Sequence, residues 1–384
     1  MSAGTVSEAG FVPPVYPFDK LTELVELASR LPGGIVDLSV GTPCDPPSPA
    51  VVEALGHSGS ERGYPAAIGS AELREAAAAW IERRFGVRLD PTGDLAACIG
   101  TKELVAGVPH WLRLRSPSRD TVLCPSLSYP TYEMGALLAG CRAVAVPSCP
   151  DGSMDLAAVS DQDAARGLCL WVNSPGNPAG QLEDLAAAAA WGRRHAVPVF
   201  SDECYVEFTW TAPATSILQH GLESVVAVHS LSKRSNLAGL RAGVYAGDPD
   251  LVGYLSAVRR HAGFMVPGPV QHAAAVAFAD DDGVAAQRRV YEERLSYLAS
   301  VLSAAGIPAG MPAGGFYLWV AAPERVASLP GTGGGGRLAR YLAEGAGALV
   351  SPGEAYGQAG RDHARLALVQ PMERLRLVAD RLAG

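Results

Sequence analysis

The sequence has little of what marks several classes of protein. Charged residues make up only 18% of its 384 residues, and the acids outnumber the bases, 39 against 31. Clustered positive charge is what binds a phosphate backbone, so we expect no nucleic-acid partner. No apolar run approaches the roughly 18 residues that a membrane helix needs, so we expect no membrane contact. The segment 1–20 lacks the basic and apolar regions of a signal peptide. These absences predict a cytoplasmic protein.

Cysteine is sparse and scattered. None of the seven cysteines forms a Cys-x-x-Cys pair, so their spacing indicates neither a zinc site nor a redox pair, and we expect no metal. An odd, dispersed set fits reduced thiols that pack as small apolar side chains. The chain is long enough for two to three domains at roughly 150 residues each, and a core of that size needs no covalent staple.

Short apolar runs bounded by Gly, Pro, Ser or Asp recur through the middle of the chain, and helical periodicity separates several of them, as at 102–114 and 182–194. Strands that alternate with helices predict an α/β fold with a mostly parallel sheet covered on both faces. Such sheets bind ligands at the carboxyl ends of their strands. The predicted strands are Leu95–Ile99, Thr121–Cys124, Ala143–Val146, Leu168–Val172, Val197–Phe200, Val225–Val228 and Ala242–Ala246.

The two ends of the chain have a different pattern, with fewer strands. We predict a large domain over residues 47–282 and a smaller α+β domain that combines 1–46 with 283–384. A Gly-rich stretch, Gly331–Gly336, has no strand before it and no Lys-Ser/Thr ending, so we interpret it as a mobile surface loop and not a phosphate cradle. The elements predicted at the ends are helices Asp19–Leu31, Gln287–Ala304 and Met372–Leu382 and strands Gly315–Ala321 and Ala348–Ser351.

Four segments with chemically useful side chains follow predicted strands. They are Gly100-Thr101-Lys102, Asn173 to Gly180 with Asn177, Ser201-Asp202-Glu203, and Ser230-Leu231-Ser232-Lys233. Each alone is also typical of ordinary structure: a helix start, a turn, an N-cap or a surface loop. Together they offer a glycine turn for a phosphate, a carboxylate for a ring nitrogen and a lysine that can form a Schiff base. That set is expected of pyridoxal phosphate enzymes.

Longer motifs, in order along nearly the whole chain, carry a resemblance to a family. They are Gly41-Thr-Pro, Gly-Tyr64-Pro, Ser-Tyr129-Pro-Thr-Tyr, Asn-Ser-Pro-Gly-Asn177-Pro, Ser-Asp202-Glu-Cys-Tyr205, Ser-Leu-Ser-Lys233 with Arg241 eight residues on, Gly-Gly-Phe-Tyr317-Leu-Trp and Ala-Arg365-Leu. The chain resembles the fold-type I aminotransferases of class I and II. The resemblance implies the fold of the pyridoxal-phosphate-dependent transferases, a pyridoxal 5′-phosphate cofactor and a homodimer with shared active sites.

The resemblance also implies a role for each matched residue. Lys233 would hold the cofactor as a Schiff base and later carry the reacting proton. Asp202 would keep the pyridine nitrogen protonated, which makes the ring an electron sink. Arg365 would bind the substrate's α-carboxylate with two parallel hydrogen bonds, with Gly41 leaving room beside it. The remaining cofactor contacts would be Asn177 and Tyr205 at the ring oxygen, Tyr129 on the ring face, Thr101, Lys102, Ser230, Ser232 and Arg241 at the phosphate, and Tyr64 at the phosphate of the partner subunit. Tyr317 lies near the pocket without an assigned role.

Within that family, the segments around Leu104, Lys233 and Pro267 are similar to the actinobacterial N-succinyldiaminopimelate aminotransferases. This implies amino transfer from L-glutamate to N-succinyl-2-amino-6-ketopimelate, a step of lysine and cell-wall biosynthesis. The chain departs from that group at Leu240, where an aromatic residue is expected, which puts the side-chain specificity in doubt. An anionic substrate needs further cations near the pocket, and the candidates are Lys102, Arg234, Arg259 and Arg260.

Three alternatives stay open on the sequence. The first is another aminotransferase, for aspartate or in a secondary pathway, which would share every cofactor residue. The second is a pyridoxal phosphate lyase or oxidase, in which Lys233 and Arg365 would persist. The third is a non-catalytic sensor of the same fold, which is disfavoured because residues 1–20 are too short for a DNA-binding domain. A nicotinamide dehydrogenase is disfavoured because no strand is followed by Gly-x-Gly-x-x-Gly.

Overall fold

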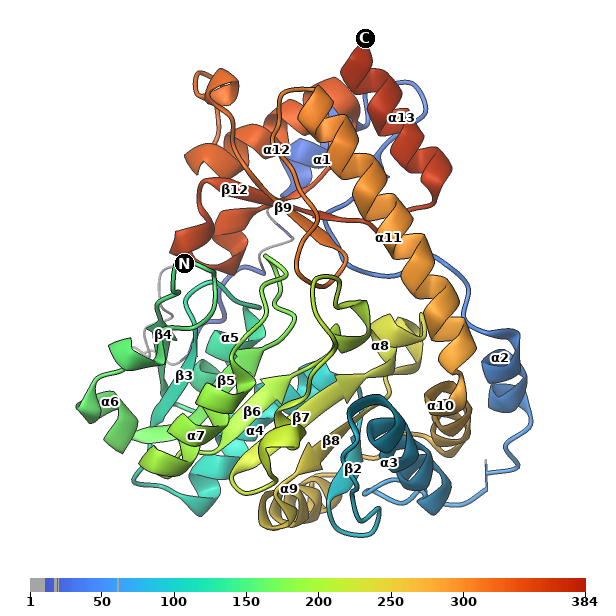
Figure 1. The fold of residues 1–384 in the computed structure, drawn as a ribbon, viewed down its shortest axis with the longest axis vertical. Coiled ribbons are helices and arrows are strands. Elements are labelled where there is room, and N and C mark those ends of the chain that lie inside the picture. Colours follow the sequence, from blue (N-terminus) through green and yellow to red (C-terminus); the bar gives the residue numbers. More distant parts are fainter. Residues whose placement is uncertain (1–10, 17–18, 20, 61) are drawn as a thin grey trace.

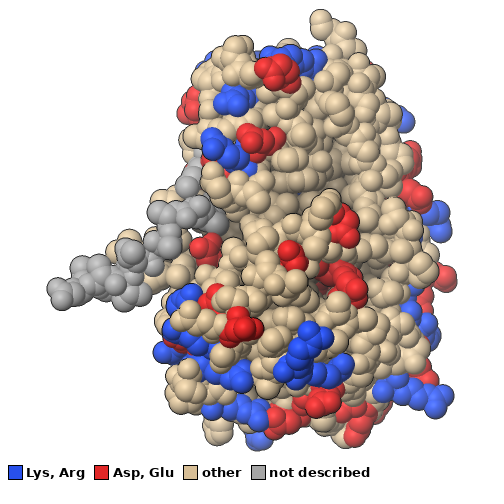
Figure 2. All heavy atoms as spheres, turned by 60° about the vertical axis from the view of Figure 1, so that its left-hand side comes forward, with Lys and Arg blue, Asp and Glu red and all other residues tan. Residues whose placement is uncertain are grey.

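The computed structural model describes residues 11–16, 19, 21–60 and 62–384 (Figure 1). Most of the segment 1–20, where we expect no signal peptide, lies outside the described residues. No helix in the described part of the chain combines the length and the apolar character that a membrane crossing requires. On the face drawn in Figure 2, acidic and basic side chains are interspersed.

A seven-stranded sheet forms the centre of the larger part of the molecule. Its order is β2-β8-β7-β6-β5-β3-β4. Every neighbouring pair is parallel except the two that involve β8, which runs against both β2 and β7. The mostly parallel sheet is therefore confirmed, with one reversed strand inside it. The bounds are β2 Leu95–Cys98, β3 Thr121–Pro125, β4 Arg142–Val146, β5 Gly167–Asn173, β6 Val199–Asp202, β7 Val225–Ser230 and β8 Gly243–Gly247.

Helices cover both faces of this sheet. Successive strand residues point to opposite sides, so each strand contributes apolar side chains to a core on either face. In β2, Leu95 and Ala97 pack into one hydrophobic cluster, whereas Ala96 and Cys98 pack into a second cluster on the other face. The first cluster includes residues of α2 Pro49–Gly56, α3 Ala71–Phe85, α7 Leu185–His195 and α10 Gly268–Ala279. The second includes residues of α4 Thr101–Arg115, α5 Thr131–Leu138 and α9 Pro249–His261. The α/β fold is confirmed. The short helices α6 Asp161–Ala165 and α8 Leu231–Arg234 complete this part.

The two ends of the chain come together in a smaller part above the sheet (Figure 1). Strand β1, from the N-terminal end, pairs in parallel with β10, and a separate antiparallel sheet has the order β11-β12-β9. The long helix α11 runs from the large sheet to this part. We propose that residues 47 and 282 divide the domains. The bounds are β1 Val36–Asp37, β9 Tyr317–Ala321, β10 Ala348–Leu349, β11 Ser351–Pro352, β12 His363–Ala367, α1 Thr22–Ala28, α11 Asp281–Ala304, α12 Gly333–Ala346 and α13 Met372–Ala383.

Two predictions for the C-terminal part were wrong. Gly333–Gly336 is the first turn of α12 and not a surface loop; three of its glycines are buried, and Gly335 lies directly against the backbone of β12. The segment Ala348–Ser351 is not one strand. Val350 separates β10 from β11, and the two pair with different partners. Neither α12 nor β12 was predicted. In α12 the glycines, which are unfavourable inside helices, mask the helical pattern.

Two glycines of α12 give a matched test of this packing. A Cβ atom on Gly335 would lie 1.9 Å from the carbonyl oxygen of His363 in β12, whereas a Cβ atom on exposed Gly345 would meet nothing within 4 Å. We expect Gly335→Ala to lower the free energy of unfolding by about 1–3 kcal/mol through overpacking. Gly345→Ala should raise it by about 0.5–1 kcal/mol, because alanine is the better helix former. Urea unfolding of both variants checks this; equal effects would contradict the close approach of α12 to β12.

Candidate active site

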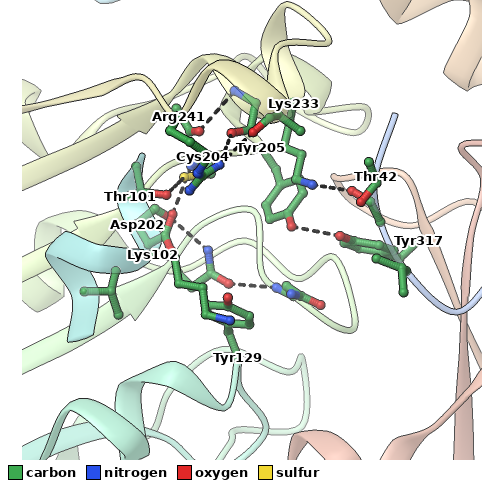
Figure 3. Close-up of a pocket in the computed structure, with 18 of the residues that line it drawn as sticks. Thr42, Thr101, Lys102, Tyr129, Asp202, Cys204, Tyr205, Lys233, Arg241 and Tyr317 are labelled. Atoms are coloured by element: carbon green, nitrogen blue, oxygen red, sulfur yellow. Dashed lines mark hydrogen bonds between the residues drawn. The ribbon is translucent and has the colours of Figure 1, made fainter. Parts of the chain in front are cut away.

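A cavity of about 480 Å³ lies at the carboxyl edge of the central sheet (Figure 3). Its lining includes every residue that the sequence proposes for the cofactor and the α-carboxylate except Tyr64. The ends of β2, β5, β6 and β7 meet at this edge because these strands are parallel. Arg241 reaches the same edge because it precedes β8, the one strand that runs the other way. The proposed residues in the lining are Gly41, Thr101, Lys102, Tyr129, Asn177, Asp202, Tyr205, Ser230, Ser232, Lys233, Arg241 and Arg365.

Asp202, the last residue of β6, places a buried carboxylate in the cavity. One oxygen accepts from the backbone N–H of Cys204 at 3.2 Å, and the other accepts from the hydroxyl of Tyr132 at 2.9 Å. Burial raises the pKa of Asp202, and these hydrogen bonds partly oppose the rise. No cation of the described residues forms an ion pair with it. Its remaining acceptor capacity fits a positively charged N–H donor in the cavity.

Lys233 brings an amine into the same space. It lies in α8, a single turn that directly follows β7 and is capped by the Ser230 side chain, which accepts from the N–H of Ser232 at 3.1 Å. The amine donates to the carbonyl of Gly41. The pKa of Lys233 is lowered to about 8, chiefly by burial; the positive charges of Arg365 and Arg241 add to the fall, and Cys204 opposes it. With a pKa of about 8, roughly a tenth of the amine is neutral at pH 7, far more than for a lysine at its ordinary value, so it is a usable nucleophile.

Arg365 is a buried guanidinium without a carboxylate partner in the part of the chain that the structure describes. It lies in β12, is 3% exposed, and donates to the Asn177 side-chain oxygen at 2.8 Å and to the carbonyl of Ser39 at 2.6 Å. The ring of Tyr317 is 4.1 Å from its guanidinium carbon, and its Nε has no hydrogen-bond partner among the described residues. A buried cation is costly unless paired, so the arrangement calls for an anionic ligand.

Tyr317, to which the sequence assigned no role, lines the cavity. Its hydroxyl is 2.8 Å from that of Tyr205. A Cβ atom on Gly41 would lie 2.2 Å from the Tyr317 hydroxyl, so Gly41 must be glycine to let this ring in. The contact with Tyr317 is thus sufficient to explain the glycine at position 41. That Gly41 leaves room for a substrate carboxylate stays a prediction.

The start of α4 and Arg241 form an anion site at the other end of the cavity. Gly100 turns the chain at φ +69°, and no side chain caps the helix. Among the described residues, nothing accepts from the backbone N–H groups of Thr101 and Lys102. A Cβ atom on Gly100 would lie 2.2 Å from the Arg241 guanidinium, so the glycine lets that cation reach the helix start. Free N–H groups at a helix start next to an arginine are suited to a phosphate.

Three of the four predicted additional cations do not line the cavity. Arg234 is buried behind Lys233, 3.2 Å from Glu207 and 3.4 Å from Asp281, and Arg259 is paired with Glu103 at 2.7 Å. Arg260 is exposed on α9 and does not line the cavity. Only Lys102 of that set does so. Tyr64 is 99% exposed in the single chain and lies outside the cavity, and its contact with a partner subunit stays a prediction.

Four residues at the site escaped the sequence reasoning. Tyr132 holds Asp202, and the side chain of Asn173 accepts from the N–H of Asn177 at 2.8 Å. Cys204 lies 3.3 Å from the Thr101 hydroxyl. Tyr132, Asn173 and Cys204 were inside the quoted motifs, so their positions could have been found there. Tyr16, which accepts from Lys102 at 3.2 Å, lies in a segment with no sequence signal.

Comparison with known proteins shows the family of this chain. Residues 34–382 match the family model of the aminotransferases of class I and II. A probable aminotransferase, Rv1178, of Mycobacterium tuberculosis is 40% identical over 96% of this chain and 85% of its own length. The 4-dedimethylamino-4-oxo-anhydrotetracycline transaminase OxyQ of Streptomyces rimosus is 39% identical over 96% of this chain and 99% of its own. The solved structure of a probable N-succinyldiaminopimelate aminotransferase from Thermus thermophilus has a TM-score of 0.84 at 30% identity, covering 95% of this chain and 98% of that one.

The fold and cavity define an α/β enzyme built to hold an anionic ligand beside a reactive lysine. The chain belongs to the aminotransferases of class I and II, and it is an aminotransferase that depends on pyridoxal phosphate. The cavity fits that cofactor: free N–H groups and Arg241 suit its phosphate, unpaired Asp202 suits its pyridinium, and the amine of Lys233 suits its aldehyde. Unpaired Arg365 remains for a substrate carboxylate.

The low pKa of Lys233 predicts that this residue destabilises the cofactor-free protein. Its pKa is about 8 in the folded state and 10.5 ordinarily, so folding must discharge or bury a cation below pH 8. We expect cofactor-free Lys233→Met to unfold with a free energy on the order of 2–3 kcal/mol higher than wild type at pH 7. Since the unfolded state binds more protons between pH 8 and 10.5, wild-type stability rises through that window and the difference closes. Urea unfolding from about pH 6 to pH 10.5 tests this, and a difference independent of pH would contradict it.

Proposed function

We propose that this enzyme transfers the amino group of L-glutamate to N-succinyl-2-amino-6-ketopimelate, in lysine and diaminopimelate biosynthesis, as a cytoplasmic homodimer. The observation that carries the proposal is the charge of the cavity: Lys102, Lys233, Arg241 and Arg365 line it against a single carboxylate, Asp202. Phosphate and one α-carboxylate engage Arg241 and Arg365. Lys102 then remains at the mouth for a further anionic group on the substrate.

The cofactor-binding residues act through hydrogen bonds and charge. The backbone N–H groups of Thr101 and Lys102 hold the phosphate together with Ser230, Ser232 and Arg241. The side-chain oxygen of Asn177 accepts a hydrogen bond from Arg365. The NH₂ group of Asn177 is therefore free to bind the ring oxygen, next to the hydroxyl of Tyr205. Tyr129 would lie against the ring of the bound cofactor, and Tyr64 of a partner subunit would contact its phosphate. The bound cofactor supplies an electron sink for the reacting carbon.

Lys233 and Asp202 are the residues of this chain that hold and move protons in the reaction. The Asp202 carboxylate keeps a proton on the pyridine nitrogen, and its buried, hydrogen-bonded setting fixes that carboxylate toward the cavity. The amine of Lys233, with its pKa near neutrality, removes the proton from the substrate's α-carbon and later returns a proton. Arg365 orients the α-carboxylate with two N–H groups in one plane, so the α-carbon is presented to Lys233 in one pose.

Lys102 carries the finer part of the proposal, the anionic acceptor. Its ammonium lies 4.9 Å above the ring of Tyr16 and donates to the Tyr16 hydroxyl. An exposed cation at the mouth can meet a distal carboxylate that Arg365 cannot reach. The similarity to the Thermus thermophilus structure supports this acceptor class.

A second candidate is a ketone of a secondary pathway. It is favoured by the 39% identity to the OxyQ transaminase, which this chain matches over 99% of that protein. Leu240 agrees with it, because it stands where the resemblance to the succinyldiaminopimelate group leads us to expect an aromatic residue. Such an acceptor would not need Lys102.

The experiment that tests the function follows the visible band of the lysine-bound cofactor. L-Glutamate should bleach it, and N-succinyl-2-amino-6-ketopimelate should restore it, whereas oxaloacetate should not. Recovery with oxaloacetate alone, or with a polycyclic ketone alone, would replace the acceptor and keep the aminotransferase. Failure of every amino donor to bleach the band would indicate lyase or oxidase chemistry instead.

Two variants separate the carboxylate sites. Arg365→Lys should lower kcat/KM for every amino acid and keto acid on the order of a hundredfold, because lysine keeps the charge and loses the paired hydrogen bonds. Lys102→Met should lower it about fivefold for the succinylated acceptor and leave pyruvate unchanged. Steady-state kinetics with both acceptors, with pyridoxal phosphate affinity as the control, give the answer. Equal losses for pyruvate and the succinylated acceptor in Lys102→Met would overturn the role of Lys102.

A further inference from the structure

Behind the start of α4 lies an ion pair whose two members, Arg259 and Glu103, do not line the cavity. Arg259 of α9 is 1% exposed, and its two terminal nitrogens donate to the two oxygens of Glu103 at 2.8 and 2.7 Å. The rings of Trp111, Tyr245 and Phe264 surround the guanidinium at 5.3, 5.8 and 5.3 Å. Its Nε has no hydrogen-bond partner in the described part of the chain, so Glu103 is the partner on which this buried charge depends.

Glu103 connects this pair to the turn that faces the cavity. It is the third residue of α4, and its Oε1 also accepts from the backbone N–H of Ile99 at 2.8 Å. That hydrogen bond ties the end of β2 to the first turn of α4, with Gly100 and Thr101 between them. The orientation of the free N–H groups at the helix start is therefore set by the Glu103 side chain, which Arg259 holds in place.

The sign of the Glu103 charge creates a conflict that Arg259 resolves. A carboxylate in the first turn of a helix is favourable for the helix itself. The same carboxylate repels a phosphate at that helix start, and a partly buried charge is poorly screened by salt. A bidentate guanidinium cancels the charge where it arises and leaves the hydrogen bond to Ile99 intact.

We propose that Arg259 is a positioning residue for the cofactor phosphate, which acts by neutralising Glu103 and fixing it as the clamp of the β2–α4 turn. The inference rests on the phosphate site proposed above and is independent of the acceptor substrate. It assigns a function to an arginine that the sequence suggested for the substrate and that the structure places outside the cavity.

The test compares the affinity of the full-length protein for pyridoxal 5′-phosphate with its affinity for pyridoxal, which lacks the phosphate. The ratio of the two dissociation constants, measured by titration of the visible band, isolates the phosphate contribution. In Arg259→Met, Glu103 keeps its charge unpaired, and the preference for the phosphorylated form should fall about tenfold. Glu103→Gln keeps the acceptor for Ile99 and removes the negative charge, so the preference should stay equal or rise.

The double variant Arg259→Met/Glu103→Gln has no charge at this place. Its preference should return to within about threefold of wild type. It also keeps the test decisive if Arg259→Met does not fold, because replacing both members of a buried pair is tolerated better than removing one. A tenfold loss in the double variant overturns the proposal, as does a loss in Glu103→Gln that equals that of Arg259→Met, since both results mean that the pair is only structural.

A matched control is the pair of Arg294 and Asp45, which is bidentate and has nearly the same burial but lies outside the phosphate end. Arg294→Met should lower stability and leave the preference for phosphate unchanged. Arg241→Met should abolish most of that preference. If Arg241→Met has no effect, the proposed phosphate site is wrong, and that failure is distinct from a failure of the Arg259 proposal, in which Arg241→Met acts and Arg259→Met does not.

Discussion

The rest of this structure depends on three charged side chains inside the molecule that have no ion-pair partner in the described chain. They are Asp202, Lys233 and Arg365. Each would cost several kcal/mol if it were simply left in an apolar interior. Hydrogen bonds from Tyr132 and Cys204, the carbonyl of Gly41 and the oxygen of Asn177 support them in part. The remaining capacity is what a ligand with a cationic ring, an aldehyde and a carboxylate completes. The same burial therefore opposes folding of the ligand-free chain and gives the cavity its capacity to bind a ligand.

Holding these groups in place requires supports that never touch a ligand. Arg234 follows Lys233 directly and is clamped by Glu207 and Asp281, so the single turn of α8 cannot rotate freely. Arg259 holds Glu103 in the corresponding way behind the start of α4. In both places an arginine that would look like a binding residue in the sequence is consumed by a buried ion pair one layer behind the cavity. The residues that line the cavity are therefore held in place by ion pairs that lie behind them.

The direction of the strands brings the two kinds of residue together. Parallel strands deliver Thr101, Asn177, Asp202 and Lys233 to one edge because their carboxyl ends coincide there. Arg241 comes to the same edge from the amino end of the reversed strand β8. Arg365 arrives from the separate sheet formed by the C-terminal part, so the substrate end and the phosphate end of the cavity rest on different sheets. The long helix α11 connects the two parts.

The sequence by itself determined the strand-and-helix alternation, the α/β class and nearly every proposed lining residue, because buried strands have a strong apolar pattern and the motifs stand at their ends. Only the tertiary structure decided which cations are available. In the sequence only the motif around Lys102 sets it apart from Arg234 and Arg259. These two arginines meet carboxylates far away along the chain, Glu207 and Glu103, and such pairing depends on distance in space. The same reason hid the helix over Gly333–Gly336: glycine is a poor helix former on its own, and only the close backbone of β12 makes it the residue that fits.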